Sequence, residues 1–446
     1  MFSVYSQANR PMSWIKWEDL MTMTLGRSRG SRACLLSLLL TATSLSAIGL
    51  ARADNGISNS EVTIGMSAAM SGPNAGYGAI GRSLEACVSY LNAEDGGVTF
   101  GDGVKRKVRL ELLDDAMEPA RALQNARRFS SQLNVFAVVG NAGTGANLGA
   151  RAYYNSEKLP QMFIGSGGPM FGDKTEVGSY PWTMPAWLAY NTEAAIYAAF
   201  IKEKFPNAKI ALLNDDSGGP FFADAFLKSA KSLGLNIVAH EEHTYSEPTI
   251  NAKISRLADS GADVFVDATT PKFVVQALKQ TASIGWKPVH IIWGVGSSIG
   301  GVFEPAGVEI SKGVYSGQWL KDQSNPAYSN DEDVKLYTAK LKQYGKSLNP
   351  ADQNAAAGWF VCYATKYLFE QMKQPTRQAF MDAARHIQNQ KMPLLLNGIT
   401  LNTNGADDGY PIEAVQISQF DGVKFNPVGG VINYENKTPP YTPLSR

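Results

Sequence analysis

Six loops in this chain share one pattern. Each follows a short apolar segment, is rich in Gly, Ser, Thr, Asn or Pro, and leads into a segment with helical periodicity. The loops are SGPNAGYG (71–78), GNAGTGAN (140–147), GSGGP (165–169), NDDSGGP (214–220), DATTP (267–271) and WGVGSS (293–298). In an open parallel sheet such loops lie beyond the carboxyl ends of the strands, where ligands bind. Small residues let backbone N–H groups approach an anion, and helix N-termini add positive potential. The pattern therefore predicts a site for a small, anionic ligand.

Between residues 62 and 293 apolar strands alternate with amphipathic helices. One predicted helix carries an apolar stripe at helical spacing, formed by Ile80, Leu84, Cys87, Val88 and Leu91. A loop-rich stretch, 165–185, interrupts the alternation, which then starts again. Two sets of βα units predict an α/β fold with parallel sheets in two similar lobes.

The last third of the chain has a different pattern. Helices are expected at 333–344, 353–372 and 375–387, and a hairpin around Asp421 and Gly422. Because this is not a third set of βα units, it must complete the two lobes already begun. We therefore expect the chain to cross between lobes more than once, with the cleft between them. The predicted lobes are 54–184 with 320–403, and 185–319 with 404–446.

The first 53 residues are typical of an export signal. Arg27, Arg29 and Arg32 precede an apolar stretch, 33–50, and an A-x-A cleavage signal at 51–53. The segment before Met21 looks like an over-extended start. An uncleaved membrane anchor is the alternative, but the apolar stretch barely reaches spanning length. We expect a mature protein that begins at Asp54 and resides in the periplasm.

Composition limits the partners of this chain. It has 446 residues, 44% of them apolar and 18% charged, with a formal net charge of +1. No long basic run is present, so nucleic acid and anionic membrane are not expected partners. We also expect a monomer. Cys87 and Cys362 lie on apolar faces of predicted helices far apart in sequence. Export permits a disulfide, but we expect two buried free thiols.

Enzyme and metal signatures are weak. GTGANLG (143–149) approaches a dinucleotide fingerprint, but its glycine spacing is off by one and no acid ends the next strand. No loop carries the Lys of a P-loop or a Gly-x-Ser-x-Gly elbow. The chain has four histidines, and HEEH (240–243) has no third metal ligand nearby, which favours a solvated surface patch. We expect no catalysis, no cofactor and no metal.

The ordered motifs resemble one family. VTIGMSAAMSGPNAGYG, LELLDDAMEPARALQNARRF, VFAVVGNAGTGANLGA, KIALLNDDSGG and VFVDATTPKFVVQALKQTASIGWKP are similar to segments of ABC-importer substrate-binding proteins for branched-chain amino acids. The resemblance implies the type I periplasmic binding-protein fold, two Rossmann-like lobes joined by three crossovers. It also implies an inner-membrane permease and an ATPase pair as partners.

The resemblance also implies site residues. In that family a carboxylate is held by the loops that match Ala142, Gly143 and Thr144, and Ser166, Gly167 and Gly168. Contacts from the second lobe match Ser217 and Thr269. Among the aromatic residues near the loops, we predict ligand contacts from Phe221 and Trp293.

Two departures from the family bear on the ligand. Amino-acid binders place an acid after the strand that matches 289–293, to pair with the α-ammonium group, and 294–298 offers none. Ser217 replaces an aromatic residue. Asp267 could substitute for the missing acid, although we expect it to cap a helix. The preferred ligand is a small aromatic or aliphatic acid. A branched-chain amino acid is the runner-up, and a ligand-sensing ectodomain of a signalling system is the alternative function.

Overall fold

The structure, a computed structural model, describes residues 54–444, which belong to one compact unit. The expected export signal, 1–53, lies outside the described residues. Within 54–444 no helix is long and apolar enough to cross a membrane.

The first sheet has six strands in the order β2-β3-β1-β4-β5-β6. All neighbours are parallel except the pair β2–β3. The strands are β1 (Glu61–Ala68), β2 (Val98–Thr99), β3 (Lys105–Asp114), β4 (Ala137–Val139), β5 (Gln161–Ile164) and β6 (Thr183–Pro185). After β1, β3 and β4 come α1 (Gly78–Ala93), α2 (Pro119–Ser131) and α3 (Thr144–Ser156). Strand β1 is buried along seven consecutive residues, as expected for a parallel strand covered on both faces.

The second sheet has eight strands, with β13-β12-β11-β10-β9-β7-β8 in order and β14 paired to β12. Neighbours from β11 to β8 are parallel, whereas β12 pairs antiparallel with β11, β13 and β14. The strands are β7 (Lys209–Asp215), β8 (Asn236–His243), β9 (Val264–Ala268), β10 (Val289–Ile292), β11 (Tyr315–Gln318), β12 (Ala414–Phe420), β13 (Phe425–Pro427) and β14 (Ile432–Asn433). The hairpin predicted at Asp421 and Gly422 is confirmed, since Phe420 pairs with Phe425.

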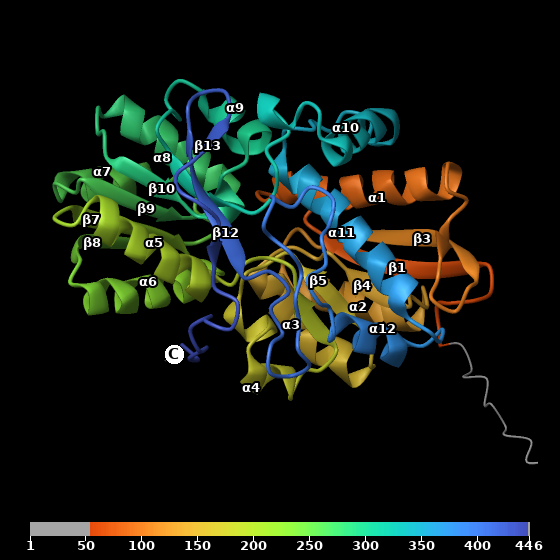
Figure 1. Ribbon diagram of the computed structural model, residues 1–446. Coiled ribbons are helices and arrows are strands. Elements are labelled where there is room, and N and C mark those ends of the chain that lie inside the picture. Colours follow the sequence, from red (N-terminus) through yellow and green to blue (C-terminus); the bar gives the residue numbers. More distant parts are fainter. Residues whose placement is uncertain (1–53, 445–446) are drawn as a thin grey trace, which may run out of the picture. The chain divides into compact units, whose positions relative to one another are not determined.

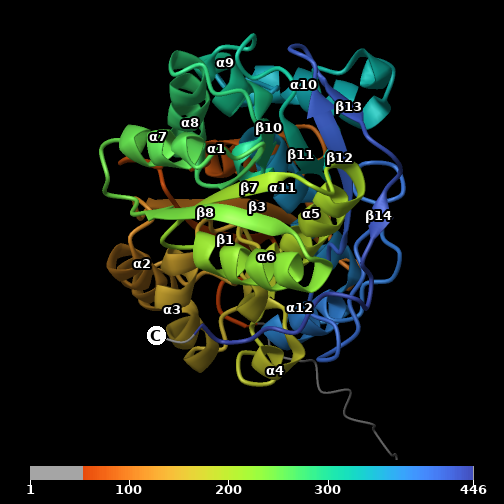
Figure 2. The same ribbon diagram turned by 90° about the vertical axis from the view of Figure 1, so that its left-hand side faces the viewer.

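Helices cover both faces of the second sheet. The helices α5 and α6 pack on one face, and α7 and α8 lie on the other (Figure 2). Their bounds are α5 (Tyr190–Lys204), α6 (Gly219–Leu233), α7 (Asn251–Asp259) and α8 (Pro271–Ser283). Two short helices, α4 (Lys174–Val177) and α9 (Glu304–Ala306), lie in connections. Parallel sheets with helices on their faces confirm the predicted α/β fold.

The last third of the chain packs helices on the side of the first sheet and adds strands to the second sheet. Figure 1 shows α11 beside α1, whereas β12 and β13 lie with the second sheet. The late helices are α10 (Glu332–Tyr344), α11 (Gln353–Gln371) and α12 (Arg377–Ala384). The chain therefore returns to the first sheet after β11 and goes back to the second for β12.

Two hydrophobic clusters support the two-lobe division, which we keep as a proposal. One cluster draws on residues 57–187 and 319–414, the other on 188–314 and 415–425. We place the third crossing at the start of β12, later than the expected boundary at 403, because the segment before β12 bonds to the first-sheet side. In that segment the Tyr410 hydroxyl donates to the carbonyl oxygen of Pro169 at 2.6 Å.

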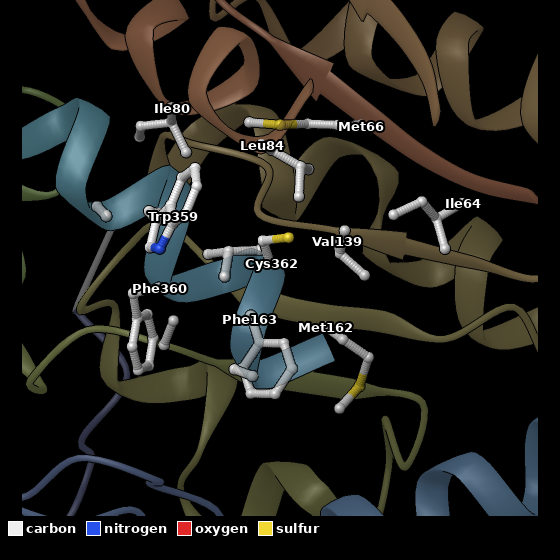
Figure 3. Packing of buried hydrophobic residues seen from close by; sticks show 14 of the residues in the cluster. Ile64, Met66, Ile80, Leu84, Val139, Met162, Phe163, Trp359, Phe360 and Cys362 are labelled. Carbon is white, nitrogen blue, oxygen red and sulfur yellow. The ribbon is translucent and has the colours of Figure 1, made fainter. Parts of the chain in front are cut away.

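The expectation of two free thiols is wrong. Cys87 of α1 and Cys362 of α11 form a disulfide, although 275 positions separate them. Both cysteines are buried, as predicted, and Cys362 points into the cluster that contains Leu84 and Val139 (Figure 3). The helices approach closely because Gly358 has no side chain. A Cβ there would lie 2.1 Å from the carbonyl oxygen of Ile80. Helix periodicity shows that each cysteine is buried, but it does not show which other helix packs against it. The sequence pattern therefore could not predict that the two cysteines pair.

Candidate functional site

A pocket lies where loops at the carboxyl ends of both sheets meet. We call it the sheet-edge pocket; its walls are Tyr77, Met117, Gly143, Thr144, Gly165, Trp187, Tyr190, Tyr245, Thr270, Trp293 and Val295. These residues follow β1, β3, β4, β5 and β6 of the first sheet and β8, β9 and β10 of the second. Ligands of open parallel sheets bind at this edge.

The walls of the sheet-edge pocket are uncharged and largely aromatic. Of the eleven lining residues that the structure describes, five are Tyr or Trp and none is Asp, Glu, Lys or Arg. The free volume is about 20 Å³, which is room for about one water molecule. A solute can therefore enter only if side chains move or the walls part.

One wall carries the start of helix α3. Gly143 has a φ of +90°, and a Cβ there would lie 2.7 Å from Met117 Cγ, so the position requires glycine. Thr144 Oγ1 lies 2.7 Å from Ser166 Oγ, which also accepts from the Gly168 N–H at 3.0 Å. The first N–H groups of a helix lack intrahelical partners and favour an anion. This wall can bind a carboxylate without a cationic side chain.

Loops of the two sheets touch directly beside the pocket. The Gly145 N–H donates to Ser217 Oγ at 3.2 Å, which joins the start of α3 to the loop after β7. A Cβ on Gly218 would lie 3.0 Å from Thr144 Oγ1 and 2.8 Å from the ring of Tyr190. Glycine at position 218 therefore lets the two loops meet.

Three of the predicted site residues line the pocket: Gly143, Thr144 and Trp293. Five others lie in or behind its walls: Ala142, Ser166, Gly167, Ser217 and Thr269. Gly168 begins a short 3-10 helix, Pro169–Phe171, and Phe221 packs on Tyr441 with ring centroids 6.3 Å apart. Ligand contact by each of the ten residues remains a prediction.

The sequence pattern missed most of the aromatic wall. Tyr77 and Thr270 lie in two of the six loops that the sequence pattern identified, so a signal for their positions was present. Tyr190 begins α5 after an irregular stretch, and Tyr245 follows β8 in a polar segment without glycine. Burial raises the pKa of Tyr190 to about 12, and the pKa of Tyr77 and Tyr245 lies well above the ordinary value for the same reason. The three phenols are therefore hydrogen-bond donors at neutral pH.

Two buried acids lie outside the wall of the pocket. Oδ1 of Asp215 accepts the N–H groups of Ser217, Gly218 and Gly219, and burial raises the pKa of Asp215 to about 7. The Asp215 Oδ2 atom has no hydrogen-bond partner among the residues described. Glu193 of α5 accepts from the N–H of Gly294 at 2.6 Å. An acid from another element therefore reaches the loop 294–298, which has no acid of its own.

Asp267 does not cap α8, and that expectation is wrong. Its Oδ1 accepts from the Thr269 hydroxyl at 2.6 Å, and its Oδ2 lies 3.4 Å from His290 Nε2. Thr270 is the N-cap residue, and its side chain makes no cap hydrogen bond. Asp267 is fully buried and does not line the pocket.

The HEEH segment, at the end of β8, is only partly a surface patch. His240 is exposed and lies 2.6 Å from Asn214 Oδ1, whereas His243 is buried against Phe273 with ring centroids 4.1 Å apart. Within 54–444 the one carboxylate-rich group close enough to hold a metal is Asp408, Glu413 and Glu435, none of which lines the pocket.

Comparison with known proteins identifies the family. A sequence model described as "Periplasmic binding protein" matches residues 61–423. The chain belongs to the periplasmic binding protein family. The resemblance seen in the sequence motifs is therefore confirmed. Among curated relatives, this periplasmic binding protein is 26% identical over 212 residues to Leu/Ile/Val-binding protein homolog 1 of Brucella abortus. That match covers 46% of this chain and 53% of the relative, so the chain spans about half the length of the curated relatives it matches.

Solved structures show the same fold. A branched chain amino acid ABC transporter protein from Thermus thermophilus with bound valine superposes with a TM-score of 0.72 at 18% identity, over 84% of this chain and 97% of that one. A solute binding protein from R. palustris in complex with 4-hydroxybenzoate superposes with a TM-score of 0.68 at 16% identity. The superposition covers 84% of this chain and 97% of that one. These periplasmic binding proteins confirm the expected type I fold.

Proposed function

We propose that this protein is the periplasmic solute-binding component of an ABC importer, and that its solute is a small aromatic or aliphatic carboxylic acid. The observation that carries the proposal is the uncharged, aromatic wall of the sheet-edge pocket beside the start of α3. The carboxylate would bind the N–H groups and the hydroxyl at Gly143 and Thr144. The apolar part of the solute would pack against Trp187 and Trp293.

The lack of a wall carboxylate favours an acid over an amino acid. A buried ammonium group without a counter-charge is costly. A branched-chain amino acid is the second candidate, because the curated relatives carry Leu/Ile/Val-binding names and one structural neighbour holds valine. A ligand-sensing ectodomain of a signalling system is a further alternative that uses the same fold.

Location and partners belong to the same proposal. The disulfide between Cys87 and Cys362 suits an oxidising compartment such as the periplasm. Closure of the two lobes on the solute would present a surface to an inner-membrane permease and its ATPase pair. We expect a monomer without cofactor or catalysis.

Titration calorimetry tests the proposal with benzoate and butyrate against leucine and valine. We expect Thr144→Val to weaken binding of every carboxylate about tenfold or more, because the substitution removes a hydroxyl at the start of α3. Thr281→Val is the matched control, since the Thr281 hydroxyl is buried and bonds only its own helix, at Leu278. Tight binding of leucine or valine with no binding of either acid would contradict the preferred ligand.

A further inference from the structure

The hydroxyl of Thr270 is a polar group without a function in the fold. Thr270 is 2% exposed, and its Oγ1 has no hydrogen-bond partner within residues 54–444. Its neighbour Thr269 donates to Asp267, so the two threonines differ although they are adjacent. A buried hydroxyl left unpaired costs about 1–3 kcal/mol and calls for an explanation.

The position of Thr270 suggests what its hydroxyl would bind. Thr270 lines the sheet-edge pocket from the loop after β9 of the second sheet, whereas Gly143 and Thr144 line it from the first sheet. A solute whose carboxylate lies at the start of α3 would direct its other end toward the second-sheet wall. Thr270 can both donate and accept there.

The aromatic residues between these walls favour a flat ring. Trp293 and Tyr190 have ring centroids 4.8 Å apart, and the Trp293 Nε1 donates to the carbonyl oxygen of Thr269 at 2.6 Å. That bond fixes the indole next to Thr270. Trp187 is held on the first-sheet side by an edge contact to Trp319 at 5.8 Å. Aromatic pairs prefer tilted or offset contacts of this kind, which a further ring can extend.

We propose that the solute is an aromatic monocarboxylate with a hydroxyl group on its ring, and that Thr270 is the residue that selects this hydroxyl. The proposal rests on the proposed function, because it assumes that the carboxylate binds at Gly143 and Thr144. A site with a buried hydrogen-bonding group discriminates strongly against a ligand that leaves the group unpaired.

Calorimetry with benzoate, 3-hydroxybenzoate, 4-hydroxybenzoate and cyclohexanecarboxylate tests the proposal on the unmodified protein and on Thr270→Val. We expect the unmodified protein to bind one hydroxybenzoate isomer about 10- to 100-fold more tightly than benzoate. Thr270→Val should reduce that preference to near unity, whatever its effect on the affinity for benzoate itself. Cyclohexanecarboxylate should bind more weakly than benzoate.

Two further variants separate the possible outcomes. Thr270→Ser keeps the hydroxyl and should keep the preference, which controls for any misfolding of Thr270→Val. Thr144→Val should weaken all four acids alike. Equal binding of benzoate and both hydroxybenzoates, or a preference that survives in Thr270→Val, overturns this inference and leaves the proposed function intact. If none of the four acids binds and butyrate does not bind either, the proposed function fails as well.

Discussion

Buried carboxyl groups behind the pocket show how single residues control the charge of this region. Glu193 accepts from the Tyr197 hydroxyl at 2.7 Å and from the N–H of Gly294, and burial raises its pKa to about 7. The folded protein therefore holds a proton that the unfolded chain releases above its ordinary pKa of 4.5. The stability that Glu193 contributes is present below pH 4.5 and is lost as pH rises to about 7.

We expect Glu193→Gln to be more stable than the unmodified protein above pH 7, by about 3 kcal/mol at most. The glutamine oxygen can accept the same two hydrogen bonds without a charge. Urea unfolding between pH 5 and 8 measures this, and Glu203→Gln, at an exposed position of the same helix, is the control. If the free energy of unfolding of Glu193→Gln changes with pH as steeply as that of the unmodified protein, Glu193 does not have this role.

At this scale the sequence predicted the lining residues at the start of α3 better than the rest of the sheet-edge pocket. Gly143 and Thr144 stand in a glycine-rich turn before a helix, which fixes their position at a strand end. The sequence pattern could not show which of Thr269 and Thr270 lines the pocket. It places their loop at a strand end but does not give the direction of each side chain. Tyr245 was missed because its position depends on how two sheets meet.

The close packing of α1 against α11 depends on a position without a side chain. Gly358 lies one helical turn before Cys362, so the same face of α11 carries both the close approach and the disulfide. Backbone fills the space that a side chain at Gly358 would need, since the nearest atom is the carbonyl oxygen of Ile80. Backbone cannot give way as a flexible side chain can.

We expect Gly358→Ala to lower the free energy of unfolding by about 3 kcal/mol, the upper part of the range for overpacked sites. Gly178→Ala is the control, because Gly178 has an ordinary φ of −62° and no atom within 4 Å of its Cβ position. Chemical denaturation measures both variants. Equal stability of the two would show that α1 and α11 can separate without cost.

Local periodicity predicted the elements well and their partners poorly. The helices expected at 333–344 and 353–372 are α10 (Glu332–Tyr344) and α11 (Gln353–Gln371), because helical periodicity is a local signal. The pairing of α1 with α11 joins segments far apart in sequence. No local signal carries that information, so the disulfide was not predicted.

At the scale of the whole molecule the C-terminal tail, residues 434–444, connects the two sheets. Thr438 Oγ1 lies 2.8 Å from Thr192 Oγ1 of α5, and Asn191 donates to the carbonyl oxygen of Pro439. The Tyr441 N–H then donates to Asp173, which precedes α4 on the first-sheet side, at 3.0 Å. Phe221 packs on this tail, which explains why it does not line the pocket.

We expect removal of residues 438–446 to lower the melting temperature by about 2–5 °C, because several hydrogen bonds of about 1 kcal/mol each are lost. Removal of residues 445 and 446 alone leaves all the described tail contacts in place and is the control. Differential scanning calorimetry compares the two truncations. Equal melting temperatures would mean that the tail does not stabilise the protein.

The disulfide has a practical consequence for anyone who handles this protein. Strands β7 to β11 all lie between Cys87 and Cys362 in the sequence. A protease that cuts any loop in that interval leaves two pieces that stay covalently joined. On a gel without reductant such nicked molecules migrate as full-length chains, and the damage becomes visible only after thiol treatment. The integrity of a preparation should therefore be judged on reducing gels.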